Sequence, residues 1–371
     1  MQTTLKRTPL FAAHQRAGGK LIEFGGWEMP VQYSSITDEH LCVRRAAGIF
    51  DISHMGEVLV SGPAAESFLN ATLTNDLRKL TPGHGQYTLL CNERGGVIDD
   101  LYAYRTGPTD FLLIINASRI TEDVAWLEKQ LAAFPQRSAV TLQNVSDMSA
   151  AVAIQGPKTP GLLDQLFPEA KPSGLKKNQI ACCKFGGAQV AVARTGYSGE
   201  DGFEIVAPAT VIESLWDTAL KLGHPFCLQP CGLGARDTLR TEMCYPLYGH
   251  ELDENTTPIE AGVGFFVALD KGDFIGRSVL ADQKASGTKK KLAAFKMTEK
   301  SAPPRPHYPI WASGVKVGET VSGTQSPSLN LGIGLGYVPP ALAKAGMKIE
   351  IEIRGKLFAA EVVAKPIYRK A

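Results

Sequence analysis

Residues 85–117 constrain the fold of this chain more than any other stretch, because three apolar segments rich in strand-forming residues follow one another closely there. NERGG at 92–96 and TGPTD at 106–110 separate the segments, and both have the composition of turns. The pattern predicts a meander of antiparallel hairpins. At least part of the core must therefore form around an antiparallel sheet.

Two adjacent aspartates, Asp99 and Asp100, lie in the middle of the second segment, GGVIDDLYAY at 95–104. Neighbouring side chains of a strand point to opposite faces, so the two carboxylates cannot share one environment. One aspartate can face water, which leaves the other facing inward. The residues alone do not decide between them.

Helices and strands intermix on both sides of this meander. Capping signals and helical periodicity predict helices at 37–48, 63–77, 118–134 and 209–223. Strands are predicted at 56–62 and within 138–159 and 181–208. Residues 1–50 are otherwise expected to mix helix and loop.

Composition changes at residues 284–306, which are rich in Lys, Ser and Pro and are expected to form a linker. Beyond them, short strands alternate with glycine turns, as in a small antiparallel barrel or sandwich. We therefore predict an α+β chain with two domains, residues 1–284 and 285–371.

The charge balance argues against several classes of partner. Of the 371 residues 20% are charged, and the formal net charge of +2 gives no field that would attract nucleic acid or an anionic membrane. No apolar run approaches the roughly 20 residues of a membrane-spanning helix. The N-terminal segment lacks the apolar core of a secretory signal. We expect a cytoplasmic protein that binds neither nucleic acid nor membrane.

Several common site types are not predicted. Seven cysteines, an odd number in a long chain, argue against a disulfide framework, and no His or Cys pair has zinc-site spacing. HELDEN at 250–255 is more typical of a polar turn than of a cation site, so no metal is expected. The chain lacks GxSxG and a strand–GxGxxG–helix unit, which argues against a serine hydrolase and a dinucleotide-binding enzyme.

Three side chains suit an organic ligand. Glu204 follows the turn YSGEDG and alternates with apolar neighbours along a predicted strand. Its carboxylate is either exposed to solvent or accepts hydrogen bonds from two adjacent N–H donors, such as those of pterins and guanines. Arg236 lies four residues before Arg240, so both lie on one helical face. The planar guanidinium group of Arg236 can bind a carboxylate through two hydrogen bonds. The alternative is a network of surface ion pairs that contributes little energy. Met55 begins a strand, where a thioether packs in the core or against a flat ligand.

Nine segments, in order along essentially the whole chain, resemble the folate-dependent aminomethyltransferases, the T-protein family of the glycine cleavage system. They are residues 5–33, 48–57, 92–104, 115–123, 153–157, 194–205, 232–242, 246–262 and 324–339. FDISHMGE, GYSGEDGFE and the series ARDTLR, LYG and TTPIEAG are specific in combination, although each alone is weak.

The resemblance implies a fold and a reaction. The family has a three-lobed, cloverleaf-like α+β fold around a central folate channel, so residues 1–284 would form two intertwined lobes and residues 285–371 a β-barrel. A partner, lipoylated H-protein, carries an aminomethyl group on its lipoyl arm. The enzyme transfers the methylene to tetrahydrofolate and releases ammonia, which gives 5,10-methylenetetrahydrofolate and dihydrolipoyl H-protein.

The resemblance also assigns residues to that reaction. It implies that Asp100 is the catalytic carboxylate near the reactive nitrogens of the folate, while Asp99 faces solvent or a structural partner. Glu204 matches the pterin-binding glutamate and Arg236 the folate-binding arginine. The other positions near the folate are matched by Met55, Tyr197, Asn116 and Tyr368.

One departure and two alternatives accompany the resemblance. Some relatives have LRLEAG where this chain has LRTEMC, so packing is expected to change at Thr241, Met243 and Cys244. A folate-dependent demethylase of a small sulfonium or amine would differ around its second substrate, and the match along both lobes argues against it. A non-enzymatic, folate-binding iron–sulfur assembly factor would carry a KGCxxGQE-like signature, which CGLGARDTLRTE lacks.

Overall fold

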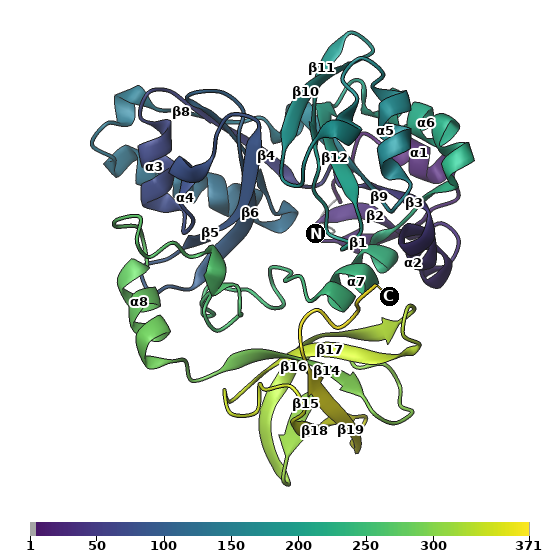
Figure 1. Cartoon of the computed structure of the whole chain (residues 1–371), viewed down its shortest axis with the longest axis vertical. Coiled ribbons are helices and arrows are strands. Elements are labelled where there is room, and N and C mark those ends of the chain that lie inside the picture. The colour runs from purple at the N-terminus through teal and green to yellow at the C-terminus, as the bar shows by residue number, and fades with distance from the viewer. Residues whose placement is uncertain (1–4, 371) are drawn as a thin grey trace. The chain divides into compact units, whose positions relative to one another are not determined.

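The structure, a computed structural model, describes residues 5–370 (Figure 1). The first four residues, part of the N-terminal segment considered for a targeting signal, lie outside the described residues. The chain forms two compact units. The first contains the described residues up to Asn70 together with Asp76–Tyr87 and Leu101–Arg236, and the second contains Ala71–Asn75, Thr88–Asp100 and the chain from Asp237 onward.

A six-stranded sheet organises the first unit. Its strand order is β10-β11-β12-β9-β3-β13, and only the pairing of β13 with β3 is parallel. The strands are β3 (Ala47–Asp51), β9 (Ser149–Gln155), β10 (Ile180–Phe185), β11 (Ala188–Ala193), β12 (Gly202–Pro208) and β13 (Leu228–Pro230). Helices α1 (Phe11–Arg16), α5 (Thr159–Leu166) and α6 (Ile212–Gly223) lie beside this sheet (Figure 1). Apolar residues of the strands and of these helices pack together in one buried core.

The predicted meander forms three neighbouring strands of a five-stranded sheet with the order β5-β6-β7-β4-β8. The strands are β4 (Gly56–Ser61), β5 (His84–Cys91), β6 (Val97–Arg105), β7 (Asp110–Ile115) and β8 (Thr141–Asn144). Helices α3 (Ala65–Thr72) and α4 (Ile120–Ala133) lie beside this sheet (Figure 1). Residues 88–91 of β5 and 97–100 of β6 are assigned to the second unit.

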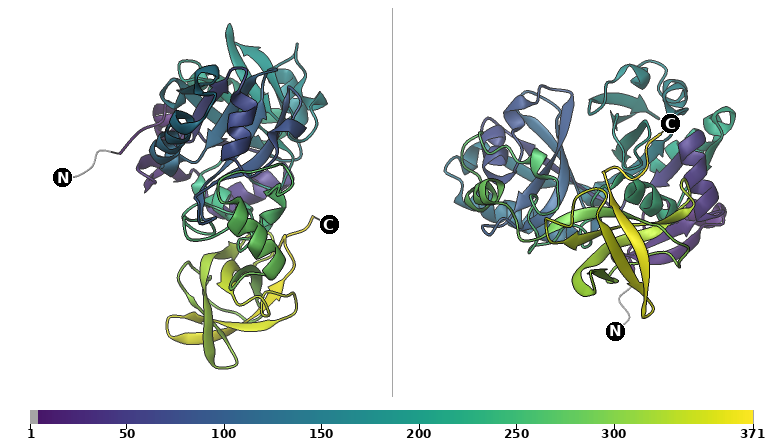
Figure 2. Two further views of the ribbon diagram at one scale, coloured as in Figure 1. Left: turned by 90° about the vertical axis from the view of Figure 1, so that its left-hand side faces the viewer. Right: turned by 60° about the horizontal axis from the view of Figure 1, so that its bottom comes forward.

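A closed antiparallel barrel dominates the second unit (Figure 2). Its strands, in barrel order, are β14 (Lys291–Met297), β17 (Leu331–Val338), β16 (Val315–Ser326), β15 (Pro309–Ala312), β18 (Lys348–Ile353) and β19 (Lys356–Val363). Inward-facing apolar residues alternate along the strands and fill the interior. Closure decides between the barrel and the sandwich that the sequence left open. Helix α8 (Arg277–Ser286) precedes β14.

Most predicted elements are confirmed, but two segments differ from prediction. Residues 1–50 contain helix α2 (Ile36–Arg45) as expected, and also the strands β1 (Lys20–Phe24), β2 (Trp27–Gln32) and β3. The expected linker at 284–306 contains β14, whose central residues are buried. In both segments, charged residues interrupt or flank a short apolar strand, so average composition conceals it.

Candidate active site

Glu204 lies on β12, and its neighbours decide which way it points. Phe203 and Ile205 are fully buried in the core against α5 and α6, so alternation gives Glu204 the opposite face, where it is partly exposed. The hydroxyl of Thr195 donates a hydrogen bond to Glu204 Oε2 over 2.8 Å, and the Tyr104 and Thr195 hydroxyls are 3.0 Å apart. Within residues 5–370, no hydrogen bond involves Glu204 Oε1.

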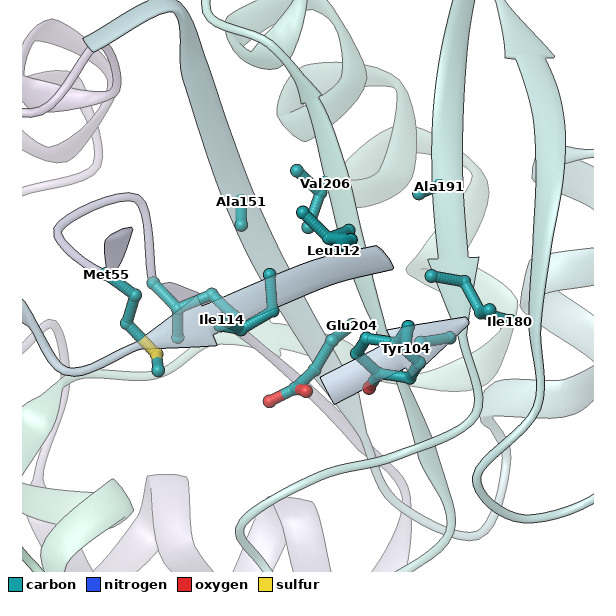
Figure 3. A pocket seen from close by; sticks show the side chains of 11 residues that line it. Met55, Tyr104, Leu112, Ile114, Ala151, Ile180, Ala191, Glu204 and Val206 are labelled. Atoms are coloured by element: carbon teal, nitrogen blue, oxygen red, sulfur yellow. The ribbon is translucent and has the colours of Figure 1, made fainter. Parts of the chain in front are cut away.

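A narrow pocket of the first unit opens beside this carboxylate (Figure 3). Glu204 is the only charged residue in its lining. The other side chains are mainly aliphatic and come from both sheets and from the turn between β3 and β4. The carboxylate points away from Ala151 and Val206 and lies between Met55 and Tyr104 in Figure 3. The volume, about 10 Å³, is room for about one water molecule, so the cavity itself does not hold a pterin-sized ring.

Arg236 and Tyr197 form a stacked pair. Arg236 occupies the first turn of α7 (Leu233–Met243), and its guanidinium carbon lies 4.8 Å from the centre of the Tyr197 ring. This is a cation–π arrangement. Burial lowers the pKa of Arg236, and the negative charge of Glu204 opposes that shift. A cation, an aromatic face and a carboxylate therefore belong to one electrostatic group in the first unit.

The turn that presents Met55 is fixed by a buried carboxylate, Asp51. Its oxygens accept hydrogen bonds from the Thr8 hydroxyl (2.7 Å) and the Ser53 N–H (2.8 Å), and Oδ2 lies 2.9 Å from His14 Nε2. Burial would raise the pKa of Asp51, but the contacts with His14, Ser53 and Thr8 outweigh burial and lower it. Met55 closes the turn by donating its N–H to the Ile52 carbonyl (3.0 Å).

Two buried ionisable residues flank Met55 and were not identified from the sequence. Burial lowers the pKa of His54 to about 4 and raises the pKa of Glu57 to about 8, so both are neutral at pH 7. In the described part of the chain, neither His54 Nδ1 nor either Glu57 oxygen has a hydrogen-bond partner. The sequence does not reveal that Glu57 is buried. Glu57 alternates with the apolar Val58 along one strand, and this pattern suggests an exposed side chain.

Asp99 and Asp100 differ in burial within the second unit. Asp99 is completely buried, whereas Asp100 is partly exposed on the opposite face of β6. Asp99 was expected to face either solvent or a structural partner. The expectation that it faces solvent is wrong. The preceding turn is set by Asn92, whose side-chain oxygen accepts the N–H groups of Arg94 and Gly96 at 3.0 and 3.1 Å.

Tyr368 also belongs to the second unit and is partly exposed. The N–H groups of Ile367 and Tyr368 donate to the Glu242 carbonyl at 2.9 and 3.0 Å, which ties the C-terminal segment to the last turn of α7. The Glu242 carboxylate in turn accepts the hydroxyls of Ser326 and Ser328.

The predicted site residues are thus divided between the units. Glu204 and Met55 line one pocket, Arg236 and Tyr197 form one stack, and Asn116, partly exposed at the end of β7, shares their unit. Asp100 and Tyr368 lie in the other unit.

Residues 5–370 contain neither a metal-binding cluster of side chains nor a membrane-spanning helix. No group of three or more His, Cys, Asp or Glu side chains there is arranged to hold a metal ion. None of the helices in the same range combines the length and apolarity required to cross a membrane.

Comparison with known proteins identifies the family. Residues 10–271 match the family model of the GCVT N-terminal domain, and residues 290–369 match that of the glycine cleavage T-protein C-terminal barrel domain. The chain belongs to the glycine cleavage T-protein family. The aminomethyltransferases of Bacillus subtilis (strain 168) and Geobacillus kaustophilus (strain HTA426) are each 46% identical to it, over 99% of this chain and 100% of their own length.

A solved structure agrees with this assignment. The crystal structure of the glycine cleavage system aminomethyltransferase T from Bartonella henselae superposes with a TM-score of 0.90 at 32% identity, over 98% of both chains. The predictions of the T-protein family, of an α+β fold with a C-terminal barrel, and of an aminomethyltransferase enzyme are confirmed. The family uses tetrahydrofolate as cosubstrate and works with H-protein. Neither the demethylase nor the assembly factor is favoured.

Proposed function

We propose that this chain transfers the methylene group of aminomethyl-lipoyl H-protein to tetrahydrofolate, with the pterin held by Glu204. The observation that carries the assignment is the carboxylate itself: it is the only charged group among the pocket-lining residues, and one of its oxygens is already fixed by Thr195. A carboxylate is an acceptor with two oxygens in one plane. The pterin ring offers two adjacent N–H donors, which match that geometry.

Arg236 and Tyr197 would complete the folate contacts of the first unit. Arginine presents five N–H donors in a rigid fork, which suits a carbonyl or carboxylate oxygen of folate. Its position over the Tyr197 ring limits the directions in which the fork can point. We assign Met55 to packing against the ring face, and Asn116 and Tyr368 to polar contacts, on the strength of the family resemblance.

Two bonds break and two form at the methylene carbon. The methylene carbon leaves the lipoyl sulfur and the amino nitrogen and joins N5 and N10 of tetrahydrofolate. The two protons lost from those nitrogens end on the dihydrolipoyl thiol and on ammonia, so atoms and charge balance.

We assign Asp100 as the catalytic carboxylate of this step. A fixed anion orients the attacking nitrogen and stabilises the positive charge that develops on it, and it can accept the departing proton. The partial exposure of Asp100 supports this assignment over Asp99, because a fully buried side chain is closed to a substrate.

A tetrahydrofolate-dependent ammonia assay tests the proposal. Purified protein is mixed with lipoylated, aminomethyl-loaded H-protein and tetrahydrofolate. We expect ammonia above the uncatalysed rate only when all three components are present. Ammonia formation that ignores tetrahydrofolate, or none above background, would overturn the proposal. Methyl transfer from a small sulfonium compound without H-protein, measured in parallel, would favour the demethylase instead.

A further inference from the structure

Helix α2 carries two buried charged side chains, Glu39 and Arg44, to which the proposed reaction assigns no role. Glu39 is 0% exposed and Arg44 is 6% exposed. A charge buried so deeply is costly unless it is paired or hydrogen-bonded. Some of the partners of these two side chains belong to the segments that carry Arg236 and Tyr197.

Glu39 caps the helix that carries Arg236. Glu39 Oε2 accepts the Gly232 N–H at 2.8 Å, while Oε1 accepts the N–H groups of Tyr33 and Ser34 at 2.6 and 2.9 Å. The Gly232 carbonyl accepts the Arg236 N–H, so Gly232 immediately precedes α7 and Arg236 lies in its first turn. The first N–H groups of a helix lack intrahelical partners, and a carboxylate there also complements the helix dipole.

The packing at Gly232 leaves this helix start little freedom. A Cβ atom on Gly232 would lie 2.4 Å from the backbone of Val31, which is far inside van der Waals contact. The start of α7 is therefore held by backbone contact on one side and by the Glu39 carboxylate on the other.

Arg44 anchors the loop that carries Tyr197. Its Nη1 donates to the Ser198 carbonyl at 2.7 Å and to Glu200 Oε1 at 3.1 Å. The Ser198 hydroxyl donates to Gln155 Oε1 at 2.7 Å, and Gln155 Nε2 donates to the Thr195 carbonyl at 3.0 Å. Residues on both sides of Tyr197 are thus fixed, and one of the anchors comes from α2.

We propose that α2 is a positioning element of the folate site, in which Glu39 sets the position of Arg236 and Arg44 sets that of Tyr197. The inference rests on the proposed function, because it takes the Arg236–Tyr197 pair to contact folate. One rigid helix then determines the 4.8 Å separation between groups on two separate segments. Glu39 and Arg44 act through their partners and are positioning residues.

Glu39→Gln tests the first contact. The amide oxygen can serve Tyr33 and Ser34, which turns the NH₂ group toward the Gly232 N–H and removes that hydrogen bond. We expect the Kd for tetrahydrofolate, measured by anaerobic calorimetry, to rise about tenfold, as the loss of one charged hydrogen bond implies. The KM for tetrahydrofolate should rise in parallel while kcat at saturation stays near its original value. Asp38→Asn, at the exposed neighbouring position, is the control and should leave both within about twofold.

Arg44→Met tests the second contact on a separate segment, so the proposal remains testable if the Glu39 variant does not fold. It should weaken tetrahydrofolate binding about fivefold, and Arg44→Lys should restore part of the loss because an ammonium group keeps a single donor contact. The exposed neighbour provides the control, Arg45→Met, which should leave binding unchanged.

A double-mutant cycle separates positioning from general destabilisation. If Glu39 acts through Arg236, Glu39→Gln should weaken binding by less than about twofold in an Arg236→Lys background. The inference would be overturned by a full tenfold loss of binding in that background. It would also be overturned if neither Glu39→Gln nor Arg44→Met changed the affinity for tetrahydrofolate. Either outcome would leave the proposed function intact. Failure of the unmodified protein to bind tetrahydrofolate would overturn the proposed function, and this inference with it.

Discussion

Burial separates the two adjacent aspartates at the residue scale, where sequence could only predict opposite faces. Asp99 is completely buried and Asp100 is partly exposed. We predict that Asp100→Asn lowers kcat for methylene transfer about a hundredfold or more with little change in melting temperature, because it removes the charge that we propose stabilises the transition state. Asp99→Asn should instead lower the melting temperature and leave the rate per folded molecule within about tenfold.

Equal losses of rate in the two variants, after correction for the folded fraction, would refute this division of roles. Rate and thermal stability must therefore be measured on the same preparations.

Glu57 gives a pH-dependent prediction of stability. Burial raises its pKa from 4.5 to about 8, so between these values the folded state holds a proton that the unfolded state has lost. Stability contributed by this group is therefore greatest below pH 4.5 and falls as the pH rises to about 8, by on the order of a few kcal/mol.

Glu57→Gln should remove this contribution, since an amide does not titrate. Urea unfolding at pH 5 and pH 8.5 measures it: the drop in unfolding free energy between the two pH values should be smaller for the variant than for the unmodified chain. An identical drop in both proteins would show that Glu57 is not buried in its neutral form.

The residue-scale predictions from sequence succeeded where a single strand decides the outcome. Alternation gave Glu204 its face because Phe203 and Ile205 share its strand. No prediction was made for the contacts of Glu39 and Arg44, whose partners near Gly232 and Ser198 come from distant parts of the chain. Spacing along the sequence carries no information about such partners.

At the scale of elements, the end of α7 shows how the departure from LRLEAG lowers the stability of the fold. Cys244 has φ +59°, the left-handed conformation that favours glycine, and it stands where those relatives have glycine. We predict that Cys244→Gly has a free energy of unfolding about 1 kcal/mol above that of Cys244→Ala, because only the alanine variant has a Cβ in this conformation.

This order is the reverse of the helix-interior preference for alanine over glycine, so chemical denaturation distinguishes the two cases directly. An alanine variant more stable than the glycine variant would mean that the backbone at 244 relaxes out of the left-handed region.

Element predictions also show where pattern reasoning loses power. The meander at 85–117 was recognised because three apolar runs and two turn sequences reinforce one another. The strands β1 and β2 were missed because their burial pattern is irregular, with charged residues within each short strand. Burial of β14 depends on its place in the closed barrel, which its lysine-rich sequence does not reveal.

At the scale of the whole molecule, family membership extends over both matched regions, residues 10–271 and 290–369. The α+β class and a C-terminal β-structure were predictable, because they depend on periodicity and turn chemistry within each segment. The division into units that exchange short pieces of chain was not, because it depends on which strands pair across long sequence separations.

A single-turnover transfer of labelled carbon tests the central claim, methylene transfer from H-protein to tetrahydrofolate, most directly. H-protein loaded with a ¹³C-labelled aminomethyl group is mixed with the chain and tetrahydrofolate, and the label is followed by NMR while ammonia is assayed. We expect the label to appear in 5,10-methylenetetrahydrofolate, with one ammonia released for each carbon transferred. Ammonia released while the label stays out of the folate would contradict it.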